Sequence, residues 1–223
     1  MSQLEVVFLG NNFERLLLGL WVSVRVALIS MGVSLVLGTL LGLLMTVRNR
    51  VVWFLTRTYV ETLRLLPQLV LLFVVFFEAA KVTGVDIPGE AAAIIVFSAW
   101  GTAELGDLVR GAVESVPAHQ RESAAALGLS PGQIQTRVVL PQAVRQLVPL
   151  TVNLTTRMIK TTPLIYFIGV TEVLAVARQV IDANRFSHPD AALWVYGVVF
   201  ILYFLVCWAI SLFARRLERT LAL

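Results

Sequence analysis

The sequence has few of the residues that build redox, metal or nucleotide sites. Its 223 residues include one cysteine and two histidines, and lysine occurs only at positions 81 and 160. The single cysteine, Cys207, excludes an internal disulfide. The G-x-x-x-x-G-K-[ST] pattern that holds nucleotide phosphates is absent, and His119 and His188 lie in separate predicted loops. We therefore expect no catalytic residue, no metal site and no cofactor bound by this chain.

Charge is also scarce, since only 14% of the residues are charged whereas 58% are hydrophobic. About 20 consecutive apolar residues cross the ~30 Å hydrocarbon core of a bilayer as a helix. Residues 26–47 and 191–214 meet this length without a charge, and three further apolar stretches contain isolated charges. The chain is thus predicted to be an all-α polytopic membrane protein with a single transmembrane domain over residues 1–223. Its five expected spanning helices cover residues 16–47, 59–80, 91–110, 144–168 and 191–214.

Arginine is unevenly distributed between the predicted loops. The net charge of +4 does not gather on one face or tail, as it does in proteins that bind nucleic acid, so no nucleic-acid partner is expected. Cytoplasmic loops of membrane proteins carry the excess of basic residues. One side of the predicted membrane holds only Arg15, Lys81, Arg178 and Arg185, and the other holds arginine at 48, 50, 57, 110, 121, 137, 145, 215, 216 and 219. This predicts an N-terminus outside and a C-terminus in the cytoplasm (N-out, C-in).

The predicted cytoplasmic connection between the third and fourth spans covers residues 111–141. Strong helix formers fill residues 121–127 and a glycine suited to ending a helix follows them, which predicts a short helix. Ser130 and Pro131 then form an N-cap and first-turn pair. They predict a second helical stretch over residues 133–139, which Leu140 and Pro141 terminate. A helix-turn-helix is therefore expected against the cytoplasmic membrane face.

This loop contains the pattern RESAAALGLSPGQIQTRVVLPQA at positions 121–143. It resembles the cytoplasmic signature of bacterial ABC importer permeases, in which E-A-A is followed after three residues by Gly and after nine more by I-x-L-P. All the spacings agree, with serine at the second position of the triplet and valine at the isoleucine position. Two further stretches, YVETLRLLPQLVLLF at 59–73 and MIKTTPLIYFIGVTEV at 158–173, resemble the polar amino-acid (histidine, glutamate, glutamine, arginine) branch. They differ from it at Leu65, Leu66, Thr161 and Pro163.

The resemblance implies a fold, partners and a location. The fold is the type I transmembrane domain of ABC importers, with a cytoplasmic coupling helix that docks in a groove of an ATPase. The implied partners are two ABC ATPase subunits, a second permease copy or close paralogue, a solute-binding protein outside, an amino-acid substrate and the lipid bilayer. ATP and Mg²⁺ would be bound by the ATPase, because this chain has no phosphate loop. The implied location is the bacterial cytoplasmic (inner) membrane, crossed several times.

The coupling helix and its flanking residues would make the contacts with the ATPase. Small side chains would allow close approach, leucines would pack, and Arg121 and Glu122 would be polar contacts. The alternative is an ordinary amphipathic connector. The coupling residues implied by the resemblance are Arg121, Glu122, Ser123, Ala124, Ala125, Leu127, Gly128 and Leu129.

Ionisable residues inside spans are costly and are therefore functional or paired by default. An amino acid presents an ammonium and a carboxylate, so a pathway near the bilayer midplane would offer an acidic group and a donor. The candidate pathway residues are Glu61, Arg64, Lys160, Thr161, Thr162 and Glu172. Pairing or packing with neighbouring helices is the competing interpretation, including an ion pair between Glu61 and Arg64. Glycines 32, 38 and 42 are expected to let helices approach closely.

Two other classes of protein compete with an ATP-driven permease. One is a stand-alone secondary transporter or channel, which would need ion coupling. The other is a membrane scaffold without transport activity. Uptake by this chain alone under an ion gradient would favour the first. Uptake that needs ATP and an ATPase partner would favour the permease, and a scaffold would support neither.

Overall fold

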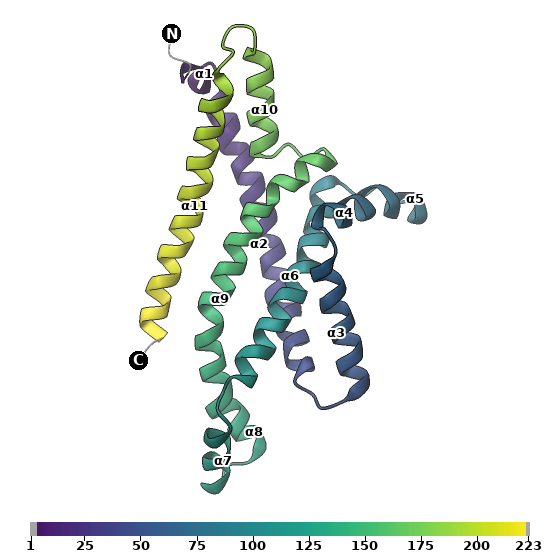
Figure 1. Cartoon of the computed structure of the whole chain (residues 1–223), viewed down its shortest axis with the longest axis vertical. Coiled ribbons are helices and arrows are strands. Elements are labelled where there is room, and N and C mark those ends of the chain that lie inside the picture. Colours follow the sequence, from purple (N-terminus) through teal and green to yellow (C-terminus); the bar gives the residue numbers. More distant parts are fainter. Residues whose placement is uncertain (1–3, 222–223) are drawn as a thin grey trace. The chain divides into compact units, whose positions relative to one another are not determined.

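The computed structural model describes residues 4–221, apart from the side chains of residues 80, 83 and 217–221. All regular secondary structure in this range is helical, without a strand (Figure 1), which confirms the all-α prediction. By length and composition, three helices could cross a membrane, or up to five spans result if each of two bent helix pairs counts as one. The three are Asn12–Met45, Gly89–Glu114 and Ala191–Arg216.

The chain begins with the short helix α1 (Glu5–Phe8) and the long helix α2 (Asn12–Met45), which lies close to the expected 16–47. The side chain of Asn49 then caps α3 (Arg50–Leu65) by accepting hydrogen bonds from two backbone N–H groups, at 2.8 and 3.2 Å. Side-chain acceptors of this kind satisfy the free donors at a helix start. The cap explains why this helix begins well before the expected residue 59.

The single helix expected over residues 59–80 is broken at Pro67. Proline lacks an N–H and disfavours the helical conformation for the residue before it. Leu66 is accordingly extended, with φ −77° and ψ 136°. Beyond the break lie α4 (Gln68–Phe73), the π-helical turn η1 (Val74–Glu78) and α5 (Ala79–Thr83).

The cytoplasmic connection predicted from the sequence follows α6 (Gly89–Glu114). It contains α7 (Ala118–Ala126) and α8 (Pro131–Ile134), which continues through the π-helical turn η2 (Gln135–Val139) into α9 (Leu140–Thr161). The expected helix end at Leu140 and Pro141 was therefore wrong. The π turn changes the hydrogen-bond register directly before Pro141, so the helix accommodates its missing N–H. The remaining elements are the 3₁₀ helix η3 (Thr162–Ile168), α10 (Val173–Asn184) and α11 (Ala191–Leu221).

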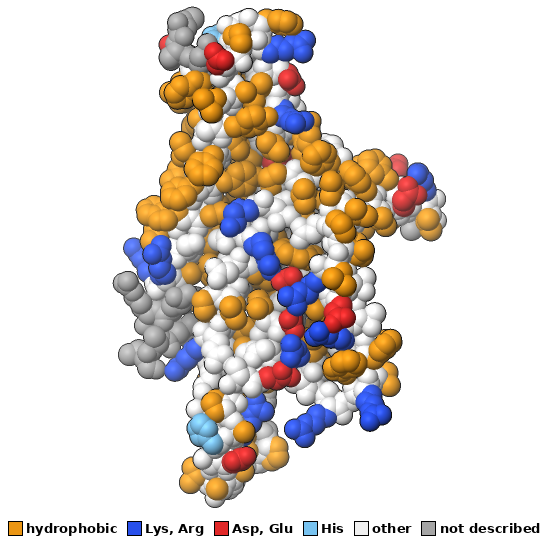
Figure 2. Space-filling model, viewed as in Figure 1, with side chains coloured by type: hydrophobic (Ala, Val, Ile, Leu, Met, Phe, Trp, Pro, Cys, Tyr) orange, Lys and Arg blue, Asp and Glu red, His pale blue; other side chains and the backbone are white. Residues whose placement is uncertain are grey.

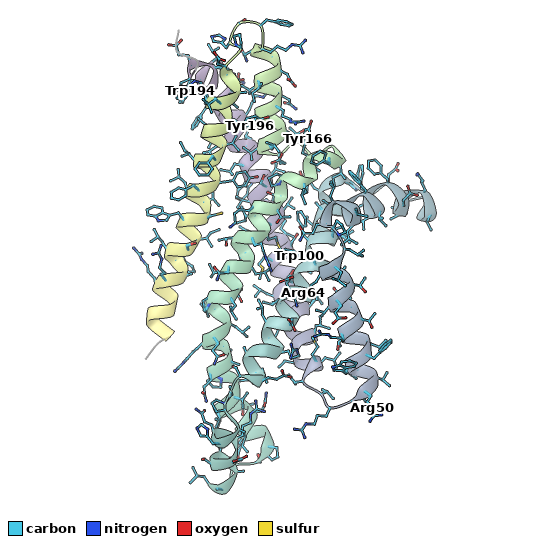
Figure 3. The ribbon with its side chains drawn as sticks, viewed as in Figure 1. Arg50, Arg64, Trp100, Tyr166, Trp194 and Tyr196 are labelled. Atoms are coloured by element: carbon cyan, nitrogen blue, oxygen red, sulfur yellow. The ribbon has the colours of Figure 1, made fainter. Side chains whose placement is uncertain are left out.

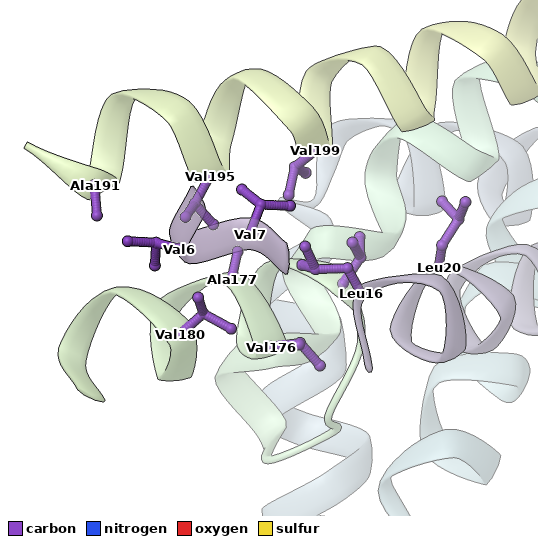
Figure 4. Packing of buried hydrophobic residues seen from close by; sticks show 11 residues of the cluster. Val6, Val7, Leu16, Leu20, Val176, Ala177, Val180, Ala191, Val195 and Val199 are labelled. Carbon is purple, nitrogen blue, oxygen red and sulfur yellow. The ribbon is translucent and has the colours of Figure 1, made fainter. Parts of the chain in front are cut away.

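The chain packs as two units, each assembled from three stretches of sequence. The first comprises Met1–Ser30, Pro67–Phe97 and Thr156–Ile210, and the second Met31–Leu66, Ser98–Thr155 and Ser211–Leu223. In the first unit, α1, the start of α2, α10 and α11 surround an aliphatic core (Figure 4). Its buried side chains are Val6, Val7, Leu16, Leu20, Val173, Val176, Ala177, Val180, Ala191, Val195 and Val199.

In the second unit, α2 and α6 approach closely at glycines. A Cβ placed on Gly42 would lie 2.5 Å from the Cβ of Val109 and 2.6 Å from the carbonyl oxygen of Gly106. A Cβ on Gly38 would lie 2.8 Å from the Cβ of Leu105. No described atom lies within 4 Å of a Cβ on Gly32. The predicted role in helix packing therefore holds for glycines 38 and 42 but not for Gly32.

Candidate functional site

The segment that was predicted to couple with an ATPase is a helix with a well-defined end. The helix α7 starts directly after Pro117, three residues before the predicted start, and ends in a Schellman motif. Gly128 has φ +83° and donates its N–H to Ala125 O at 2.9 Å, while the N–H of Leu129 bonds Ala124 O at 3.1 Å. Only glycine adopts this left-handed conformation without strain. The prediction of a helix ended by Gly128 is therefore confirmed.

The second helical piece is fixed at its start by a capping box. The Oγ of Ser130 accepts a hydrogen bond from the N–H of Gln133 at 3.4 Å, and the Oε1 of Gln133 accepts one from the N–H of Ser130 at 2.9 Å. Because both bonds satisfy free helix-start donors, the turn between α7 and α8 has a single preferred geometry. Figure 1 shows the two helices side by side as one compact hairpin.

The two faces of α7 differ in exposure. Ala124 is buried, whereas Glu122, Ser123 and Ala125 are exposed. Leu127 is 81% exposed and does not pack within the chain. An apolar side chain on a bare helix end is a surface that suits a partner.

Arg121, which was predicted to be a polar contact with the ATPase, is partly buried and also bonds within the chain. Its Nη2 donates a 2.6 Å hydrogen bond to the carbonyl oxygen of Val113, in the last turn of α6. Gln142 of α9 also reaches the hairpin, because its amide donates to the side chain of Gln120 at 2.5 Å. These bonds tie α7 to the two long helices that flank it.

Glu61 and Arg64 do not pair with each other, contrary to the alternative considered above. Glu61 accepts a hydrogen bond from Arg57 one turn earlier, at 2.5 Å. Arg64 bonds Asp107 at 2.8 Å and Glu104 at 3.3 Å, so α6 supplies its partners. Figure 2 shows acidic and basic side chains mixed over α3 and α6, and Figure 3 labels Arg64 on this face. Sequence spacing could not reveal that a second helix would offer two carboxylates.

Glu172 is fully buried and caps α10. Its carboxylate accepts hydrogen bonds from the N–H groups of Leu174 and Ala175, both at 2.9 Å, and from the Oγ of Ser23 at 3.3 Å. The hydroxyl of Tyr203 donates to the same Ser23 oxygen at 3.4 Å. Glu172 is thus held by α2 and α10, with its hydrogen-bonding capacity used inside the chain.

Thr162 joins this polar cluster, whereas its neighbours in the sequence do not. The Oγ1 of Thr162 lies 3.3 Å from the hydroxyl of Tyr203 and donates to Ile159 O at 2.7 Å. Pro163 has no N–H to offer that carbonyl four residues back, so the threonine hydroxyl replaces it. Thr161 bonds Arg157 O at 2.9 Å. The carbonyl oxygen of Ile159, which Pro163 cannot bond, is therefore occupied by the hydroxyl of Thr162.

Comparison with known proteins identifies the family of this chain. The family described as "Binding-protein-dependent transport system inner membrane component" matches residues 35–222. The chain belongs to this family. It is therefore a subunit of a membrane transport system and not an enzyme.

Individual relatives of this permease cover nearly all of its length. A probable glutamine ABC transporter permease, GlnP of Bacillus subtilis, is 32% identical over 95% of the chain and 97% of the relative. A glutamate transport system permease, GluD of Corynebacterium glutamicum, is 30% identical over 91% of the chain and 73% of its own length.

Two solved structures show the same fold. The permease superposes on a chain of an amino acid ABC transporter crystallised with histidines with a TM-score of 0.84 at 20% identity, over 97% and 99% of the two chains. The inward-facing MetNI methionine ABC transporter gives a TM-score of 0.73 at 20% identity, over 94% and 97%. Both confirm the fold of ABC importer permeases.

Glu172 is buried, whereas Lys160, in the same unit, is exposed. Lys160 lines a cavity of about 400 Å³ with Pro163, Phe200, Tyr203, Phe204 and Cys207. The sequence therefore predicted three residues of the first unit, Lys160, Thr162 and Glu172. Hydrogen bonds of Ser23 and Tyr203 connect Glu172 with Thr162. Those two connecting residues were missed, because serine and tyrosine in apolar helices carry no signal of which partner they face.

Arg25 was also missed. It lies directly before the uncharged run used to predict the first span, and α2 continues through it. Its Nη2 bonds the Oε2 of Glu90 at 2.5 Å, which pairs α2 with the start of α6 in the first unit. The expected span 16–47 contains this arginine, but the sequence indicated no partner for it, and a long side chain can stay paired within a helix bundle.

Replacing Glu172 with alanine should lower the stability of the permease by about 2 kcal/mol, because a helix cap and a buried hydrogen bond are both lost. Glu172→Gln keeps one acceptor oxygen and should cost less. Thermal unfolding of the detergent-solubilised chain measures both effects. Glu14→Ala removes an exposed carboxylate and serves as the control. If the Glu172→Ala variant has the same Tm as the wild type but no longer binds substrate, the carboxylate contacts the substrate and does not stabilise the helix start.

Proposed function

We propose that this chain is the permease subunit of an ATP-driven importer for a polar amino acid in a bacterial cytoplasmic membrane. Family membership establishes the transport system, and the glutamine and glutamate permeases among its relatives support an amino-acid substrate. The chain forms one transmembrane permease domain over residues 1–223. It crosses the bilayer five times, N-out and C-in, with each bent helix pair serving as one span.

The energy of ATP hydrolysis reaches the permease through α7. Two ATPase subunits bind and hydrolyse ATP with Mg²⁺, and one of them receives the exposed side of α7 in a groove. A second permease copy or a close paralogue completes the pathway, and an external solute-binding protein delivers the amino acid. Closure of the ATPase pair moves α7, and the bonds of Arg121 and Gln142 carry this movement into α6 and α9.

The observation that carries this proposal is the end of α7. The signature glycine occupies the left-handed position of a Schellman motif, and the signature proline follows a π turn inside a continuous helix. A short helix with a fixed end, followed by a second helix that runs without a break into a long one, can transmit displacement without bending. An ordinary connector needs neither feature.

The substrate pathway is proposed around Glu61, Arg64 and the segment that contains Lys160, Thr161, Thr162 and Glu172. Cations and carboxylates both occur among these residues, which suits a zwitterionic ligand. Glu61 and Lys160 are exposed, so they are better placed to meet a substrate than the buried Glu172.

Reconstitution into vesicles tests the function. Uptake of labelled glutamine or glutamate should require the chain, the ATPase, the binding protein and ATP together. Omitting any one of them should reduce uptake to the background of empty vesicles. Uptake driven by an ion gradient in vesicles that contain only this chain would refute the proposal in favour of a secondary transporter.

A further inference from the structure

A basic cavity lies at the turn between α2 and α3 in the second unit. Its volume is about 480 Å³, and its wall continues onto the ends of α6 and α7. Arg48, Arg50 and Arg121 line it, and the only acidic lining residue is Glu114. Glu114 already accepts a hydrogen bond from Arg110 at 2.6 Å. The cavity therefore presents an excess of positive charge.

The guanidinium groups of this cavity have unused donors. No ion pair or side-chain hydrogen bond joins Arg48 or Arg50 to another described residue. Arg121 uses one Nη for Val113, and its buried Nε has no hydrogen-bond partner among the described residues. Arginine forks match the oxygens of a phosphate group. An anion with several oxygens would satisfy donors that the chain itself leaves unmatched.

The first turns of α3, beside the cavity, are apolar and exposed. Val51, Trp53, Phe54 and Leu55 are each 61–66% exposed, and Trp53 also lines the cavity. Figure 3 labels Arg50 at this end of α3. Tryptophan beside basic residues marks the boundary between headgroups and acyl chains. A ligand here would meet cations at one end and an apolar surface at the other.

We propose that this cavity binds the headgroup phosphate of an anionic phospholipid, with the acyl chains lying along Val51, Trp53, Phe54 and Leu55. The assignment rests on the proposed function in one respect, the cytoplasmic side of the α2–α3 turn. Basic pockets at that surface attract anionic lipids. Since Arg121 belongs both to the cavity wall and to α7, the bound lipid would lie beside the coupling helix and reinforce its attachment to α6.

Lipid retention tests the proposal independently of transport. The purified chain is placed in phosphatidylcholine vesicles without ATPase or nucleotide, and immobilisation of spin-labelled phosphatidylglycerol is compared with that of spin-labelled phosphatidylcholine. Each basic residue near a membrane surface contributes about five-fold in affinity for anionic lipid. Arg48→Gln together with Arg50→Gln should therefore weaken phosphatidylglycerol binding by about 30-fold. Phosphatidylcholine should show no change.

Two matched variants separate the cavity from its alternatives. Arg48→Lys with Arg50→Lys keeps the charge and should retain most of the binding. Arg178→Gln with Arg185→Gln makes the same charge change elsewhere and should have no effect. Unchanged binding after the Arg48 and Arg50 glutamine substitutions, or equal loss in the Arg178 and Arg185 control, would overturn the proposal. Displacement of the lipid by millimolar inorganic phosphate would overturn the lipid assignment in favour of a free anion.

Discussion

Gly42→Ala should lower the Tm of the detergent-solubilised permease by about 5–10 °C. The new Cβ would lie 2.5 Å from Val109 Cβ and 2.6 Å from the carbonyl oxygen of Gly106, and the second of these contacts is with backbone. Backbone cannot rotate away, so α2 and α6 must separate. Overpacking of this kind costs about 1–3 kcal/mol, and each kcal/mol moves the Tm of a chain this size by about 2–4 °C.

Gly32→Ala is the matched control because Gly32 lies on the same helix. A Cβ there has no described atom within 4 Å. Alanine is also the better helix former, by about 0.5–1 kcal/mol, so the Tm should stay or rise slightly. Equal melting of the Gly32 and Gly42 variants would show that α2 and α6 do not pack through Gly42.

Gly128→Val should uncouple ATP hydrolysis from substrate uptake. At φ +83° a side chain costs about 1–2 kcal/mol, which changes the equilibrium between the ordered and frayed helix end by about 5–30-fold. No described atom lies within 4 Å of a Cβ at this position, so the whole effect comes from backbone strain. Membrane insertion should survive while the amount of substrate imported per ATP hydrolysed falls several-fold.

Gly128→Asn and Gly132→Ala complete the Gly128 experiment. Asparagine tolerates the left-handed conformation better, so it should retain more coupling than valine. Gly132 lies in the same loop without a positive φ and with no described atom within 4 Å of a Cβ, so its alanine variant should couple normally. Normal coupling in the Gly128→Val variant would show that the Schellman motif at the end of α7 is not needed for coupling.

The sequence predicted the coupling helix well because its signals are local. Gly128 ends a helix wherever its neighbours favour one, and Ser130 needs only Gln133 to complete a capping box. The two errors in helix continuity concern proline. Pro67 breaks a helix that was expected to continue, and Pro141 lies within a helix that was expected to end. A proline removes one N–H in both places, and the surrounding backbone decides whether a π turn can absorb the loss.

Contacts between distant helices could not be predicted from the sequence. Arg64 pairs with two carboxylates of α6, and Glu172 meets Ser23, which lies 149 positions earlier. Hydrophobic spans share the same apolar pattern on every face, so the sequence does not say which face meets which neighbour. The cost of a carboxylate within an apolar segment pointed to Glu172, but only the structure reveals that it caps a helix.

Docking of the ATPase on α7 is tested most directly by one binding measurement. Leu127 and Val82 are 81% and 86% exposed, so aspartate at either position meets little steric resistance within the chain. Membranes that contain Leu127→Asp should bind the purified ATPase at least about 30-fold more weakly than wild type, as expected for loss of a buried apolar anchor. Val82→Asp should bind the ATPase normally. Wild-type affinity for Leu127→Asp would contradict α7 as the point at which ATP energy enters the permease.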